Sequence, residues 1–447
     1  MTGAKKYMDY YKSIGRLALP LFIGQLGNIA LAFADNIMVG QYSTSALASA
    51  SFVNNIFNIA IFSCVGFTYG LTPLVGALFS RGENDSIGRM VNVGLRVNTV
   101  FTVVVMTLMT ALYFCLDRLG QPEELLPLIR PYYLIVLSGM LPVMLFNVFA
   151  QWSYAINNTA VPTWIVLGCN VLNVIGNYML IYGNFGCPEL GLTGAGISTL
   201  LSRVVCAVLM CAVFFCTAFG RQYRQGFRQN KAVPGEAREV ARTGFPVSMQ
   251  MTFETASFSG SALMSGWLGA VPLAAFQIVA ITGMLGFCLY YSIAAAMAIP
   301  MSHAAGRGDS VTQRRLAWSG LHLILLCMTL TCCIFLFGGR YLMSAFSSDP
   351  AVVAAAMGVI SAIVLYQLGD AVQITFANAL RGTSHVMPML YIAFVSYIVV
   401  GLPVTYLLGF TAGLGLYGIV LSFSVCLMLA GALYLFFFLR ATRPEKL

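Results

Sequence analysis

Long apolar stretches follow one another along almost the whole of this 447-residue chain. A helix that crosses a bilayer needs about 20 mostly apolar residues, and short polar segments divide the chain into twelve stretches of about that length or more. They are 14–38, 46–78, 96–116, 128–152, 160–182, 193–219, 243–268, 272–300, 316–338, 352–378, 386–409 and 415–439. The pattern predicts an all-α polytopic membrane protein with twelve transmembrane helices.

Charged residues are scarce, at 9% of the chain, whereas soluble domains contain about 25%. This composition excludes a water-soluble fold. With the N-terminus inside, all Lys and Arg lie on the inner side except Arg118, Arg130, Arg340 and Arg203. Because cytoplasmic loops are enriched in Lys and Arg, we expect a multi-pass protein of the bacterial cytoplasmic (inner) membrane with both termini in the cytoplasm. The net charge of +9 therefore reports topology, and we expect no nucleic-acid partner.

Residues that interrupt helices recur 226 positions apart in the two halves of the chain. The matching pairs include Pro20 and Pro246, Gly82 and Gly308, and Pro162 and Pro388. One ungapped spacing predicts two related six-helix bundles. Since six is even, both bundles enter the membrane in the same direction, as in parallel-repeat transporters that bind substrate between their halves. We divide the chain into an N-lobe, 1–220, a cytoplasmic linker, 221–242, and a C-lobe, 243–447.

Three carboxylates lie deep in apolar sequence, namely Asp35, Glu254 and Asp370. A charge at the bilayer centre costs at least roughly 2.5–3.5 kcal/mol on insertion scales, so such a group needs a partner cation, a proton, or both. The structural alternative is that each carboxylate pairs with a basic side chain or accepts hydrogen bonds. Arg203 is the one basic residue within a span and cannot neutralise all three. We therefore interpret the set as functional ionisable groups.

Other polar side chains occur in the same spans. Asn173 and Asn177 are four residues apart and share a helix face, and Thr199 lies in the next span. With Asp35 they form a set suited to a monovalent cation or a proton network, although ordinary interhelical hydrogen bonding would use the same residues. In the second half the further candidates are Tyr366, one turn before Asp370, and the cavity-lining candidates Gln277 and Gln373.

The segments "LALPLFIGQ", "ADNIMVG", "NVLNVIGNYMLIYG", "GLTGAGISTLLSR", "GFPVSMQMTFE" and "LGDAVQITFANALRG" resemble, in order, those of the MATE family, the multidrug and toxic compound extrusion transporters. The resemblance implies twelve helices in two lobes that form a V. It also implies efflux of mostly cationic organic compounds by antiport with Na⁺ or H⁺, through alternating access.

By position, the resemblance assigns roles to individual residues. Asp35, Asn173, Asn177 and Thr199 correspond to an N-lobe cation or proton site. Glu254 and Asp370, with Tyr366, correspond to the C-lobe cation site of NorM-type members, where Na⁺ would bind. The presence of both Glu254 and Asp370 favours the NorM type over the DinF type, because DinF-type relatives typically lack these two acids. Asn177 stands where DinF-type relatives usually carry Asp, which argues against the N-lobe site by itself holding Na⁺.

A lipid or polysaccharide-precursor flippase of the same superfamily is the alternative function. It would favour cationic side chains for a phosphate-bearing substrate, whereas the deep acids here outnumber the one in-span base. An enzyme is not expected, because no P-loop, nucleophile elbow or His/Cys metal spacing occurs. We expect no cofactor, Na⁺ or H⁺ as coupling ion, small cationic or amphipathic substrates, membrane lipids as surroundings, and a monomer.

Overall fold

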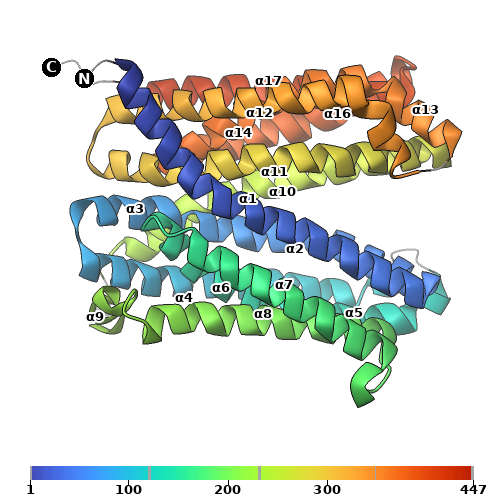
Figure 1. Ribbon diagram of the computed structural model, residues 1–447, viewed down its shortest axis with the longest axis horizontal. Helices are drawn as coiled ribbons and strands as arrows, with labels where there is room; N and C mark the ends of the chain where they lie inside the picture. The colour runs from blue at the N-terminus through green and yellow to red at the C-terminus, as the bar shows by residue number, and fades with distance from the viewer. Residues whose placement is uncertain (1–2, 119–121, 230–232, 348, 444–447) are drawn as a thin grey trace. The chain divides into compact units, whose positions relative to one another are not determined.

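The computed structural model describes residues 3–118, 122–229, 233–347 and 349–443. Within these ranges the chain consists of helices joined by short turns (Figure 1). Part of the expected linker, 230–232, lies outside the described residues, as do the two ends of the expected lobes, 1–2 and 444–447.

The first half of the chain makes six passes. Its helices are α1 (Gly3–Tyr42), α2 (Thr44–Tyr69), α3 (Leu71–Arg81), α4 (Asn84–Tyr113), α5 (Leu126–Ser138), α6 (Met140–Ala155), α7 (Ala160–Tyr182) and α8 (Gly191–Cys216), with the short helices η1 (Leu116–Arg118), η2 (Glu123–Leu125) and η3 (Asn184–Gly186) in the connections. The second pass breaks at Gly70 and the fourth at Gly139. A Cβ on Gly70 would stand 2.5 Å from the backbone nitrogen of Gly244, so the first break permits close contact between two backbones.

The second half also makes six passes. Its helices are α10 (Glu236–Trp267), α11 (Ala270–Gly306), α12 (Ser310–Ser344), α13 (Pro350–Gly358), α14 (Ile360–Gly382), α15 (Met387–Ala393), η5 (Phe394–Gly401), α16 (Leu402–Tyr406), η6 (Leu407–Thr411) and α17 (Gly415–Ala441). Both η5 and η6 are π-helical. Glycines bring α14 and α17 together (Figure 1), since a Cβ on Gly431 would lie 3.1 Å from the backbone nitrogen of Gln373.

Eleven passes among the described residues are long and apolar enough to cross a membrane. The pass that falls short is α10, which covers the predicted span 243–268 as far as Trp267. Its sequence "MQMTFETASFSGSALMSGW" intersperses Thr, Ser, Gln and Glu among the apolar residues. A pass of this composition is suited to the interior of a bundle, since polar groups in a span usually face away from lipid.

The 226-residue repeat is visible in backbone geometry. Gly82 and Gly308, which follow α3 and α11, both adopt a left-handed conformation, with φ of 74° and 71°. After them, the Glu83 N–H donates to the Leu78 carbonyl at 3.2 Å, and the Asp309 N–H donates to the Ala304 carbonyl at 3.0 Å. The two donor residues are 226 positions apart, and so are the two acceptor residues. Each hydrogen bond closes the end of its helix as in a Schellman-type C-cap.

Packing divides the chain into two compact units, Ile23–Ser248 and Met249–Leu447 with Met1–Phe22. The start of α1 belongs to the second unit, where the Tyr11 hydroxyl lies 2.9 Å from Nδ1 of His322 on α12. These units are defined by contacts, whereas the expected lobes are defined by the repeat. The lobe boundaries stay a prediction.

The described part of the expected linker is folded against α4. It forms η4 (Arg221–Tyr223) and α9 (Arg224–Gln229) before α10 begins. Asn92 of α4 donates to the Phe227 carbonyl at 2.7 Å, and Arg89 pairs with Glu236 at 2.8 Å. Gly226 approaches the Asp85 carbonyl so closely that any side chain there would collide with it.

Candidate functional site

Asp35 is partly buried on α1 and faces the α7 amides. The amide nitrogen of Asn177 donates to its Oδ1 at 2.5 Å. Asn177 and Asn173 are both fully buried, and their amides lie within 3.2 Å of each other. The structure therefore brings together the three residues that the sequence placed on two different spans.

Asn173 can serve two protonation states of Asp35. With its nitrogen towards Asp35, the amide donates to the carboxylate at 3.0 Å. With its oxygen towards Asp35, it suits a protonated carboxyl group, and its nitrogen donates to the hydroxyls of Thr199 at 3.1 Å and Ser202 at 3.3 Å. The same cluster can thus hold Asp35 charged or neutral, because an amide presents a donor at one end and an acceptor at the other.

Close packing of α7 on α8 sets this geometry. Gly176 leaves room for Ser198, whose hydroxyl donates to the Asn173 carbonyl at 2.8 Å. Asn177 Oδ1 is buried and has no hydrogen-bond partner among the described residues, which leaves one acceptor at the site for a cation or a water molecule. Arg203 of α8 interacts electrostatically with Asp35 and Tyr132, and its guanidinium occupies the space beside Gly139.

The two deep acids of the second half lie in one cluster. Glu254 of α10 is partly buried and accepts a hydrogen bond from Gln250 at 2.6 Å. Asp370 of α14 is 7% exposed and lies within electrostatic range of Glu254. In the part of the chain that the structure describes, neither carboxylate forms an ion pair with a basic side chain. Glu254 and Asp370 therefore lie within electrostatic range of each other, with no ion-paired Lys or Arg among the described residues.

Tyr366 lies beside Asp370, within its electrostatic range. Its hydroxyl fits over Gly283 of α11, 2.5 Å from the position that a Cβ on that glycine would take. A Cβ on Gly286, three residues further along α11, would lie 3.1 Å from the Thr331 methyl group of α12. Gly283 therefore makes room in α11 for the Tyr366 hydroxyl of α14, and Gly286 for close packing of α12.

The two glutamines expected to line a cavity behave differently. Gln373 is buried on α14, and its amide nitrogen donates to the hydroxyl of Tyr397 at 2.9 Å. Gln277 is exposed on α11, without a hydrogen bond to the acids among the described residues. The cavity-lining role expected of the two glutamines stays a prediction.

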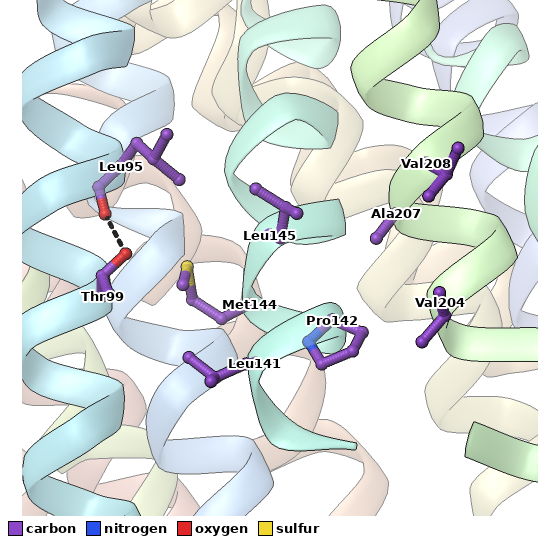
Figure 2. Close-up of a pocket in the computed structure, with 9 residues that line it drawn as sticks. All are labelled: Leu95, Thr99, Leu141, Pro142, Met144, Leu145, Val204, Ala207 and Val208. Atoms are coloured by element: carbon purple, nitrogen blue, oxygen red, sulfur yellow. Dashed lines mark hydrogen bonds between the residues drawn. The ribbon is translucent and has the colours of Figure 1, made fainter. Parts of the chain in front are cut away.

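An apolar cavity of about 420 Å³ opens between α4, α6 and α8 (Figure 2). Leu95, Leu141, Pro142 and Val204 are among its lining residues, and the hydroxyl of Thr99 is used in a hydrogen bond to the Leu95 carbonyl at 2.7 Å. None of the candidate site residues lines this cavity. None of its lining residues is titratable.

The MatE family model matches residues 20–179 and 246–407. The chain belongs to the MatE family. The two matches begin 226 residues apart, in agreement with the repeat. The chain is 29% identical over 444 residues to a probable multidrug resistance protein NorM from Bradyrhizobium diazoefficiens, covering 97% of this chain and 94% of that protein. A protein of the same name from Geobacillus kaustophilus is 28% identical over 435 residues, with 96% and 95% covered. These relatives confirm the predicted NorM-type resemblance.

Solved structures of MatE proteins share the fold. A mutant of the Vibrio cholerae MATE transporter VcmN superposes with a TM-score of 0.88 at 16% identity, over 99% of both chains. A MOP superfamily transporter from Pyrococcus furiosus gives 0.87 at 17% identity, over 98% of this chain and 97% of that chain. These matches confirm the predicted twelve-helix fold, and the chain is a multi-pass membrane protein.

Several polar residues in these clusters were not predicted from the sequence. Ser202 and Gln250 hydrogen-bond to Asn173 and Glu254, and helical spacing could have found Gln250, which is four residues before Glu254. Tyr397 carries no such signal, because it lies on a different span from the acids and in a π-helical segment whose register a sequence pattern does not reveal.

Proposed function

We propose that this protein is a secondary multidrug efflux transporter that exports organic cations by antiport with Na⁺ or H⁺. The observation that supports it most is that partly buried Glu254 and buried Asp370 lie within electrostatic range of each other, with no ion-paired Lys or Arg among the described residues. The names of the NorM relatives support efflux of drugs.

The coupling follows from the cost of a buried charge. A carboxylate in a dry bundle has to be neutralised, and a proton, Na⁺ or a cationic substrate can each do so at Glu254 and Asp370. Only one of these occupants fits at a time, so loading by the external ion weakens the binding of substrate and releases it outside. Alternating access between the N-lobe, 1–220, and the C-lobe, 243–447, would carry the site across the membrane.

Asp35 supplies a second ion site in this scheme. Its amide partners suit both the charged and the neutral carboxyl group, as Asn173 can turn either end towards it. Asp35, Asn173, Asn177 and Thr199 would therefore bind and release a proton without rearrangement of the helices. In the second half, Tyr366 would complete the cation site with the two acids.

Uptake of the fluorescent cation ethidium into proteoliposomes tests the proposal, with Na⁺ and pH gradients imposed separately. We expect uptake to require one of the two gradients. The triple variant Asp35→Asn, Glu254→Gln, Asp370→Asn should reduce gradient-driven uptake to the level of empty vesicles. Uptake that needs neither gradient, or that persists in the triple variant, would contradict antiport. Transfer of a labelled anionic lipid between leaflets, with no ethidium transport, would support the flippase alternative instead.

A further inference from the structure

Four aromatic side chains form a continuous run at the turn between α7 and α8, at the opposite end of α8 from α9 (Figure 1). Tyr42, at the end of α1, contacts Tyr182 of α7, with ring centroids 6.3 Å apart. Tyr182 contacts Tyr178, one turn earlier, at 6.2 Å, and Tyr178 contacts Phe185 of η3, also at 6.2 Å. Tyr178 and Phe185 are 49% and 81% exposed. The cluster therefore presents aromatic rings outside the packed interior of the bundle.

The turn that carries Phe185 has a strained backbone. Phe185 has φ of 57° and ψ of 28°, the left-handed conformation, which bulky side chains rarely adopt. The side-chain nitrogen of Asn184 donates to the Tyr178 carbonyl at 3.1 Å and ties the turn to α7. Burial of the ring within the protein does not offset this strain, because Phe185 is exposed. Uncompensated strain of this kind is found at ligand-binding sites.

Glu189 places a carboxylate beside these rings. Its Cβ lies 3.1 Å from the position that a Cβ on Gly183, directly after Tyr182, would take. The Tyr42 ring stands over Gly191, where an added Cβ would lie 2.6 Å from a ring carbon, and the Tyr42 hydroxyl is within hydrogen-bonding range of the Glu189 carboxylate. Glu189 is exposed and forms no ion pair with a Lys or Arg in the described part of the chain. An acid and exposed rings therefore lie together at one end of the unit.

This combination of groups is suited to organic cations. The face of an aromatic ring attracts a cation, and clusters of rings recognise quaternary ammonium groups. The nearby carboxylate adds attraction for positive charge and repels anions. A large organic cation can contact the ring faces and the acid together, whereas an anionic or uncharged ligand gains nothing from the acid.

An aromatic belt at the membrane surface is the alternative role for these rings, since Tyr and Trp are enriched where spans meet that surface. A belt requires neither a carboxylate beside the rings nor a strained turn that exposes Phe185. Phe337 of α12 provides a comparison, because it is 85% exposed and its helix contains no Asp or Glu. The acid and the strain therefore favour a binding site over an anchor.

We propose that Tyr178, Phe185 and Glu189, with Tyr42 and Tyr182 of the same cluster, form a peripheral binding site for organic cations. The orientation predicted from Lys and Arg places this end of α7 outside, where an exported cation is released. Tyr178 is exposed, whereas Asn177 next to it is fully buried, so the site is distinct from the Asp35 cluster. The substrate class rests on the proposed function, but binding at this site does not depend on transport.

Photolabelling with ethidium monoazide tests the site in the purified full-length protein, without any gradient. Mass spectrometry of peptides should locate saturable labelling between Tyr178 and Leu190, and tetraphenylphosphonium should compete for it. Glu189→Gln should raise the concentration at half saturation about two- to five-fold at low salt. This difference should shrink at high salt, because exposed charges are screened. Labelling that does not saturate, or that Glu189→Gln leaves unchanged, would overturn the proposal.

The variant Phe185→Gly separates binding from packing. Glycine adopts a left-handed conformation without strain, so this variant should unfold at the same or a higher temperature. Its concentration at half saturation should nevertheless rise about two- to five-fold, because one ring is lost. Phe185→Trp should restore binding, since Trp attracts cations most strongly, and Phe337→Ala is the matched control that should leave labelling of the turn unchanged. A Phe185→Gly protein that loses stability but labels normally would assign Phe185 to packing and overturn the proposal.

Ethidium uptake by proteoliposomes distinguishes failure of this site from failure of the proposed function. Saturable labelling of the turn in a protein that does not transport ethidium would reject the proposed function and keep the site. Gradient-driven uptake with no saturable labelling between Tyr178 and Leu190 would keep the function and reject the site.

Discussion

Asp309 and Glu83 occupy equivalent positions of the two repeats, but only one of them caps the helix that follows. Asp309 accepts hydrogen bonds from the backbone nitrogen and the hydroxyl of Thr312, at 2.9 and 2.5 Å. Glu83 makes no side-chain cap, because its longer side chain turns towards Arg81 instead, at 4.0 Å. The hydrogen bonds from Thr312 lower the pKa of the Asp309 carboxyl below its ordinary value of 3.8.

The substitution Asp309→Ala should therefore lower the free energy of unfolding by about 1 kcal/mol, the usual effect of losing an N-cap. Because the pKa is lower in the folded protein, this contribution is present above about pH 3.8 and is lost as the pH falls through the folded value. Unfolding in mixed detergent micelles measures it, with Glu83→Ala as the matched control that should cost little. An equal loss of unfolding free energy in the two variants would show that the Asp309 cap contributes nothing to stability.

At the scale of helices, glycines decide which polar groups meet. Gly283 of α11 faces the Tyr366 hydroxyl of α14, whereas Gly338 of α12 has no atom within 4 Å of an added Cβ. The first glycine makes room for a side chain at the candidate cation site, and the second does not contact another element. The same chemical change at the two positions should therefore have different consequences.

We expect Gly283→Ala to reduce ethidium uptake several-fold while the protein stays folded, because the flexible end of Tyr366 can move aside but then leaves the acid cluster. Gly338→Ala should retain uptake and raise stability by about 0.4–1 kcal/mol, since alanine restricts the unfolded chain. Uptake assays and unfolding of the two purified variants measure both effects. Normal uptake by Gly283→Ala would remove Tyr366 from the site.

For the whole molecule, the basic residues and the order of passes predict which surfaces face the cytoplasm. Cys115 follows α4 and Cys216 ends α8, and both are exposed. With the N-terminus inside, an odd number of passes precedes Cys115 and an even number precedes Cys216. They should therefore lie on opposite sides of the membrane.

A membrane-impermeant maleimide should label Cys115 in right-side-out vesicles and Cys216 only after permeabilisation. Mass spectrometry of the labelled peptides provides the readout, and Cys64, which is 2% exposed, should stay unlabelled in both conditions. Labelling of Cys216 in sealed vesicles would reverse the topology deduced from Lys and Arg.

The passes, the repeat and the deep acids could be predicted from the sequence because each depends on a local or periodic property. Apolar length identifies a span, an ungapped spacing identifies the repeat, and a carboxylate in an apolar stretch is visible by itself. The α7 pair Asn173 and Asn177 also follows from helical spacing. Gln277 has no such spacing relation to the acids, and its expected cavity-lining role stays a prediction for a residue that is exposed on α11.

The sequence by itself determined that the chain is a twelve-pass membrane protein with three acids deep in its spans and one in-span base. Tertiary structure decided which side chains surround them, because contacts between helices depend on rotation, breaks and close glycine approaches that periodicity does not encode. Tyr397 shows this most clearly, since a π-helical turn brings it inward and Gln373, on another pass, fixes its hydrogen bond. The sequence shows which acids can bind a proton or a cation. The packing of α10, α14, α17 and η5 determines which side chains surround Glu254 and Asp370.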